Sequence, residues 1–98
     1  MTAIQVALLS PVGTDQRLTV SNSAVALSAI TDDASHVFVD FQSAAVMVTF
    51  DGSTPTSTNG HRYASGSSAT WSKATATAAR FIREGSTDGV VHCTPLRY

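Results

Sequence analysis

The 98-residue sequence is poor in charge, has a single cysteine and lacks any long apolar run. Lys, Arg, Asp and Glu together make up 13% of the chain, about half of the usual ~25% in a soluble domain. The net charge of −1 provides no electrostatic basis for binding nucleic acid. No apolar run approaches the ~18 residues of a membrane span, so no membrane partner is expected.

The scarcity of cysteine also constrains how the chain is held together. Cys93 is the single cysteine and cannot form an intramolecular disulfide, so the fold must be stable without one. The segment Met1–Gln5 has no basic region ahead of its short apolar run, which argues against a signal peptide. The sequence therefore predicts synthesis and folding in a cytoplasm.

Small polar residues take the place of the missing charges. The chain contains 13 Ser and 13 Thr, so 26 of 98 positions carry a hydroxyl, while apolar residues make up 43%. Disorder is a poor interpretation of that apolar content. A weakly charged, hydroxyl-rich surface repels copies of itself poorly, which favours a subunit of an assembly over a free monomer.

The hydrophobic period is close to two along most of the chain, which is typical of β-strands. The clearest predicted strands are residues 36–41, 45–50, 79–84 and 89–94. Weaker ones are residues 4–8, 17–20 and 24–27, with a short helix over 23–30 as the alternative to the last. We expect 36–41 and 45–50 to pair with each other, and 85–88 to form the turn of a hairpin between the last two strands. The stretch 72–78 has no clear period.

This spacing predicts a single all-β domain over residues 1–98, with about seven to nine short strands. The expected fold is a small antiparallel β-sandwich or barrel, jelly-roll-like in character. Its predicted core consists of Val46, Val48, Phe50, Phe81 and one face of the run Val37-Phe38-Val39.

Few residues occur in patterns typical of metal-binding or catalytic sites. His61, His92 and Cys93 match no usual zinc spacing, and neighbours on a strand point to opposite faces, so no metal or cofactor is expected. Asp32, Asp33 and Asp51 sit in turn sequences, where Asp is favoured for its backbone hydrogen bonds. The sequence has no Gly-x-Ser-x-Gly elbow and no phosphate-binding loop, so we expect no enzyme and no catalytic residue.

The aromatic and basic residues have structural explanations. Trp71 could stack on a ligand such as a sugar, but a lone Trp in a small β domain more often packs in the core or an interface. Four arginines could form a patch: Arg62, Arg80, Arg83 and Arg97. Acidic residues lie near them, so we expect salt bridges between subunits and no polyanion site.

The C-terminal half carries a resemblance. Its motifs come in a fixed order. The first is the run Val48-Thr49-Phe50-Asp51-Gly52-Ser53-Thr54-Pro55-Thr56, followed by Asn59-Gly60-His61, Gly66 and Trp71. The last is the run Phe81-Ile82-Arg83-Glu84-Gly85-Ser86-Thr87-Asp88-Gly89-Val90-Val91-His92. This order resembles a type of small virion protein of tailed bacteriophages over about residues 46–94. The first third of the chain matches it only in strand rhythm.

The resemblance implies an all-β accessory protein of the virion, made in the host cytoplasm and used in several copies. A capsid decoration (cement) protein, binding the major capsid protein as a homotrimer, is the leading expectation. A tail, spike, fibre-base or head–tail connector component is the alternative. A small carbohydrate-binding β module is the second alternative; it would need a row of exposed aromatics.

Overall fold

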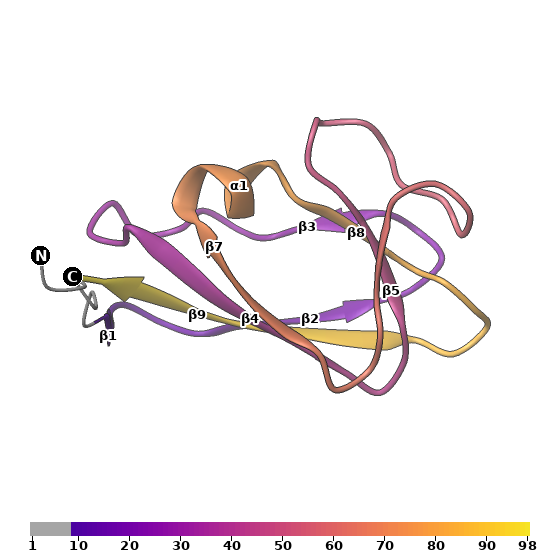
Figure 1. Ribbon diagram of the computed structural model, residues 1–98, viewed down its shortest axis with the longest axis horizontal. Helices are drawn as coiled ribbons and strands as arrows, with labels where there is room; N and C mark the ends of the chain where they lie inside the picture. The colour runs from indigo at the N-terminus through magenta and orange to yellow at the C-terminus, as the bar shows by residue number, and fades with distance from the viewer. Residues whose placement is uncertain (1–8) are drawn as a thin grey trace, which may run out of the picture.

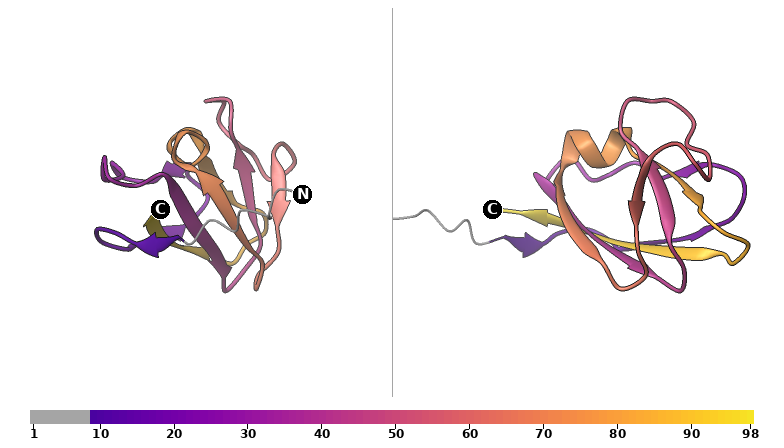
Figure 2. Two further views of the ribbon diagram at one scale, coloured as in Figure 1. Left: turned by 60° about the vertical axis from the view of Figure 1, so that its left-hand side comes forward. Right: turned by 45° about the vertical axis from the view of Figure 1, so that its right-hand side comes forward.

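The computed structural model describes residues 9–98, which form two antiparallel β-sheets packed against each other (Figures 1 and 2). Sheet A contains β1 (Ser10–Pro11), β2 (Gln16–Val20), β4 (His36–Gln42), β7 (Ser68–Ser72) and β9 (Gly89–Arg97). Sheet B contains β3 (Val25–Ala26), β5 (Val46–Thr49), β6 (His61–Tyr63) and β8 (Arg80–Arg83). The prediction of a small all-β sandwich is thereby confirmed. The predicted strand 4–8 lies outside the described residues.

Sheet A has the strand order β1-β9-β4-β7, and β2 also pairs with β9. The nine-residue strand β9 is long enough to pair with β1, β2 and β4 along its length. Sheet B has the order β3-β8-β5-β6. The strand β7 therefore ends sheet A on one side, and β6 ends sheet B.

The core lies between the sheets and follows the alternation of the strands. In β4, the inward Val37, Val39 and Phe41 are buried, whereas Phe38 on the outer face is 40% exposed. Sheet B contributes the fully buried Val46, Val48 and Phe81. The predicted core is confirmed at these positions, but Phe50 is only partly buried at its margin.

The prediction that residues 36–41 and 45–50 pair with each other is wrong. Strand β4 hydrogen-bonds to β7 and β9, whereas β5 hydrogen-bonds to β6 and β8 in the other sheet. The short link between them turns through Ser43, which has a φ of 73°, and carries the chain from sheet A to sheet B. Placed in opposite sheets, the two strands turn buried apolar residues toward the same core.

The predicted hairpin around residues 85–88 is also wrong, for the same reason. The end of β8 stays in sheet B, where Arg83 lies opposite Val46 of β5 and Glu84 N–H donates to the Ala45 carbonyl. Strand β9 then begins in sheet A at Gly89, where a Cβ would lie 2.7 Å from a methyl of Val46. Absence of a side chain at Gly89 lets the chain cross closely over β5.

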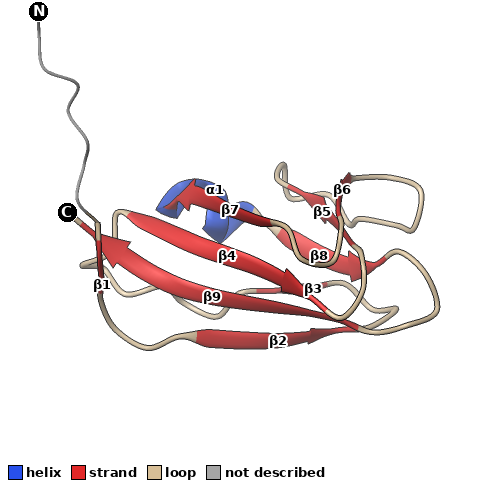
Figure 3. Ribbon diagram, turned by 60° about the horizontal axis from the view of Figure 1, so that its bottom comes forward, coloured by secondary structure: helices blue, strands red, loops and turns tan. Residues whose placement is uncertain are grey.

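One helix, α1 (Lys73–Ala78), occupies part of the stretch that showed no clear period (Figure 3). Ser72 is its N-cap, and the Ser72 hydroxyl accepts a hydrogen bond from Thr75 N–H at 3.2 Å. The buried Ala76 turns one side of the helix to the core. Residues 23–30 adopt no helix, and the strand there is limited to the two residues of β3.

Candidate functional site

The three residues considered as metal ligands do not meet. His61 lies on β6 in sheet B, whereas His92 and Cys93 are neighbours on β9 in sheet A. Cys93 points inward and is 2% exposed, while His92 points outward and is partly buried. Within residues 9–98, no group of three or more His, Cys, Asp or Glu is arranged to hold a metal ion.

The Cys93 thiol is a packing group. Burial, and to a smaller extent the negative charge of Asp15, raises the pKa of Cys93 to about 12. The thiolate is the form that attacks electrophiles and binds metals. At neutral pH this side chain is therefore a small buried hydrophobe.

Sequence reasoning missed the contact that His92 does make. His92 Nε2 and Asp15 Oδ2 are 3.0 Å apart, although the two residues are 77 positions apart in the chain. The antiparallel pairing of β2 with β9 sets Arg17 opposite His92 and brings the residue before β2 alongside. The hydrogen bond from His92 holds the pKa of Asp15 below its ordinary value of 3.8. Only knowledge of that strand pairing could have revealed the contact.

One hollow of the described surface lies where β5 runs into the long loop before β6. It has a volume of about 450 Å³, is widely open to solvent, and is lined by Thr49, Phe50, Asp51, Ser53, Asn59, Gly60 and His61. Residues 51–60, between β5 and β6, thus shape much of it. Phe50 and His61 form its aromatic side, with ring centroids 5.7 Å apart.

Three polar residues of this hollow, Thr49, Asp51 and Ser53, are hydrogen-bonded to one another. Asp51 Oδ1 accepts hydrogen bonds from the Ser53 hydroxyl at 2.6 Å and from Ser53 N–H at 3.1 Å. These bonds hold the pKa of Asp51 below its ordinary value of 3.8. The Thr49 hydroxyl donates to the Ser53 carbonyl at 2.6 Å. Asp51 therefore acts as a turn former, as its position before Gly52 predicted.

The rest of the loop is also internally bonded. Thr56 and Asn59 exchange backbone hydrogen bonds of 3.0 and 3.3 Å, and Pro55 is buried.

The neighbouring acidic residues Asp32 and Asp33 lie exposed in a separate turn, across which Ala34 N–H donates to the Thr31 carbonyl. The Lys73 ammonium lies 3.4 Å from Asp32. Each of these segments is accounted for by its own turn chemistry.

Trp71 lies in the core. It is 8% exposed and points inward from β7. Four aromatic rings surround it, with centroids 5.1 to 6.3 Å away: Phe41, Phe50, Tyr63 and Phe81. The predicted packing role is confirmed, and the indole is not available to stack on a ligand.

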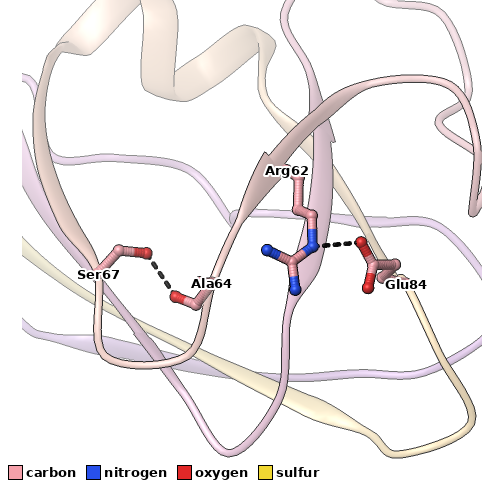
Figure 4. A network of polar contacts seen from close by, with 4 residues as sticks. All are labelled: Arg62, Ala64, Ser67 and Glu84. Atoms are coloured by element: carbon pink, nitrogen blue, oxygen red, sulfur yellow. Dashed lines mark hydrogen bonds and ion pairs between the residues drawn. The ribbon is translucent and has the colours of Figure 1, made fainter.

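Two of the four arginines pair within the chain. Arg62 on β6 bridges to Glu84, just after β8, and the pair spans β5 because β5 lies between those strands (Figure 4). The same view shows Ser67 bonded to the Ala64 carbonyl in the turn that leads to β7. Arg83 bonds to Asp88 at 2.6 Å. Arg62 and Arg83 thus have acidic partners in their own chain, and the expected salt bridges between subunits stay a prediction.

The outer face of sheet A presents side chains of β9, β4 and β7 to solvent. We call it the sheet A face, and its centre is made by three rows across β9, β4 and β7. The rows are Leu96-His36-Ser72, Thr94-Phe38-Thr70 and His92-Asp40-Ser68. Phe38, at the middle, has a hydroxyl residue on each side, and Asp40 is the single carboxylate among these nine residues.

Comparisons of the chain with protein families, with characterised proteins and with solved structures found no match. Among residues 9–98, no helix is long and apolar enough to cross a membrane.

Proposed function

We propose that this protein is a structural component of a tailed-bacteriophage virion, and specifically a capsid decoration protein that binds the major capsid protein in several copies. The resemblance over residues 46–94 motivates the class of particle. The character of the sheet A face is the observation that supports a docking role. In its central row, Phe38 is 40% exposed between Thr94 and Thr70.

Such a face suits binding to another protein. Exposed Ser and Thr hydroxyls can pair across an interface, so covering them with protein costs little free energy. Aromatic residues, Phe among them, are enriched at protein interfaces. Many copies bound side by side would turn modest single contacts into strong retention on a shell.

The two alternatives make different demands on the same chain. A tail or connector component would use a similar face but in few copies at one vertex. A carbohydrate-binding module would need a row of exposed aromatics for sugar stacking. The described surface exposes two large hydrophobic side chains, Phe38 and Tyr98, and the indole of Trp71 is buried.

Co-sedimentation with particles tests the proposal. The purified chain is mixed with particles of the phage that encodes it, stripped of the native protein, and bound protein is measured after pelleting. We expect Phe38→Asp to lose binding, because the interface would bury an unpaired carboxylate at its centre. Ser86→Asp, in the exposed link between β8 and β9, adds the same charge outside the central rows and is the matched control. Equal binding by wild type and Phe38→Asp would contradict the proposal.

A further inference from the structure

We infer that the free edge of β7 pairs with β7 of a second copy of this chain, in antiparallel register about a two-fold axis through Thr70. The inference goes beyond the proposed function, because it names the surface through which two copies of this chain associate, and its test does not depend on the virion role. It is carried by the direction of the backbone groups of β7, by their exposure, and by the fit of the strand to itself.

The backbone direction follows from the hydrogen bonds that flank the pairing of β4 with β7. Phe41 N–H donates to the Ser67 carbonyl at 2.9 Å, and Lys73 N–H donates to the Ser35 carbonyl at 3.0 Å. In an antiparallel ladder, residues alternate between facing the partner strand and facing away from it. Ala69 and Trp71 therefore direct N–H and C=O toward β4.

The residues between them face the opposite way. Ser68, Thr70 and Ser72 direct their backbone groups toward the free edge of β7, and all three residues are exposed. Among the described residues, β7 has no strand on that side. Unpaired amides and carbonyls in such a row are a template for another strand.

The other sheet edges are less suited to pairing with a second strand. Strand β2 is another edge of sheet A, and its first residue already bonds to a neighbouring loop. The Gln16 side chain accepts from Ser28 N–H at 2.8 Å and donates to the Ser28 carbonyl at 3.0 Å. The edge strands of sheet B are short, with three residues in β6 and two in β3. The five residues of β7 contain no charge, no proline and no glycine, which are the usual means of blocking an edge.

The sequence of β7 is complementary to itself when reversed. An axis through Thr70 sets Thr70 opposite Thr70, Ser68 opposite Ser72, and Ala69 opposite Trp71. The outward side then carries a ladder of hydroxyls, and the inward side pairs the largest side chain with a small one. Thr70 of each copy would donate to and accept from Thr70 of the other, and Ser72 N–H would donate to the partner's Ser68 carbonyl.

The consequence is one continuous sheet across two copies. Both sheet A faces then lie on the same side of the assembly, with a Phe38 on each, so one dimer presents two docking centres. A two-fold contact predicts a dimer, or an assembly built from dimers, in place of the homotrimer expected from the sequence.

Amide hydrogen exchange on the intact chain tests the pairing without any substitution. At high protein concentration we expect the Thr70 and Ser72 amides to be protected, and on dilution to lose that protection at least about tenfold. The Ala69 and Trp71 amides serve as internal controls, because their bonds to β4 persist in the monomer. Equal exchange of Thr70 at both concentrations overturns the inference.

Sedimentation of wild type and variants provides the second measurement. The wild type should sediment with twice the 10.2 kDa mass of the chain. Thr70→Pro removes an outward amide while sparing the bonds to β4, and should raise the dimer dissociation constant at least about tenfold. Thr70→Val keeps the amide and should leave the dimer intact.

The remaining outcomes are also decisive. A trimer in which the Thr70 amide exchanges freely overturns the β7 contact and leaves the proposed virion role standing. A dimer whose Thr70 amide is protected, but which fails to bind particles, supports the contact and contradicts the virion role. If Thr70→Pro does not fold, the exchange measurement decides alone.

Discussion

Phe81 is one of the two largest fully buried side chains that pack between the two sheets. Its ring is fully buried, stacks on Trp71 at a centroid distance of 6.2 Å, and lies 6.5 Å from Phe41. Replacing it with Ala leaves a cavity that the surrounding rings cannot close. We expect Phe81→Ala to lower the free energy of unfolding by about 3–5 kcal/mol, as measured by chemical denaturation. Phe38→Ala, on the exposed face, is the matched control and should cost far less; equal losses would show that Phe81 is not central.

Asp15 makes the stability of the fold sensitive to acid. Its pKa in the folded state is lowered, first by the hydrogen bond with His92, from an ordinary value of 3.8. A depressed folded pKa contributes stability that is present above the unfolded value and lost as the pH falls through the folded one. We therefore expect the free energy of unfolding to fall below about pH 3.8 and Asp15→Asn to flatten that decline. Asp33→Asn, in an exposed turn, should leave the acid profile as it is in wild type.

Cys93 should be chemically silent in the folded protein. With its pKa raised to about 12, the thiol is almost entirely protonated at pH 8. We expect an aromatic disulfide reagent to react with Cys93 only as fast as the chain unfolds, and fully in denaturant. Fast stoichiometric labelling of the native protein would contradict a buried position.

At the scale of single elements, Gly60 fixes the end of the long loop against β5. Its φ is +142°, and a Cβ there would lie 3.0 Å from the Val48 carbonyl oxygen. Both strain and contact with backbone therefore oppose a side chain. We expect Gly60→Ala to cost about 1–3 kcal/mol of unfolding free energy. Gly85→Ala is the control, because a Cβ at Gly85 meets nothing within 4 Å; a loss there as large as at Gly60 would refute this reason.

The elements also show how far the sequence determines the fold. Period two located β2, β4, β5, β8 and β9 and overlapped β3, but it missed β1, β6 and β7. Alternation assigned the inward face of β4, with Val37 and Val39 buried and Phe38 outward. It did not determine which strands pair. The links 43–45 and 84–88 have the length and composition of hairpin turns, yet both carry the chain from one sheet to the other. A hairpin turn and a link between two sheets can have the same local turn residues. Which of the two forms depends on how the flanking strands are buried in the core.

The sequence predicted only those features of the candidate site that depend on residues near one another in the chain. The turn at Asp51 and the inward position of Trp71 follow from residue type and alternation. The pairing of His92 with Asp15 depends on the register of β2 with β9, and the bridge from Arg62 to Glu84 depends on β5 lying between β6 and β8. No short-range pattern encodes contacts made between strands so distant in the chain.

At the scale of the whole molecule, low charge, abundant hydroxyls and an open strand edge all favour association with other protein chains. A monomer with a five-residue neutral edge risks uncontrolled strand pairing. Pairing two copies through that edge covers it and leaves the sheet A face free to dock. The same surface chemistry thus supports both self-association and attachment to a larger shell.

The copy number of the chain in purified virions tests the central proposal most directly. Quantitative mass spectrometry against the major capsid protein would measure it, after washing that removes unbound protein. A decoration protein on a symmetric shell should be present in roughly dozens to hundreds of copies per particle, whereas a tail or connector component should number about three to twelve. We predict the higher range; a count in the lower range would contradict decoration, and absence of the chain from the particle would contradict the virion role altogether.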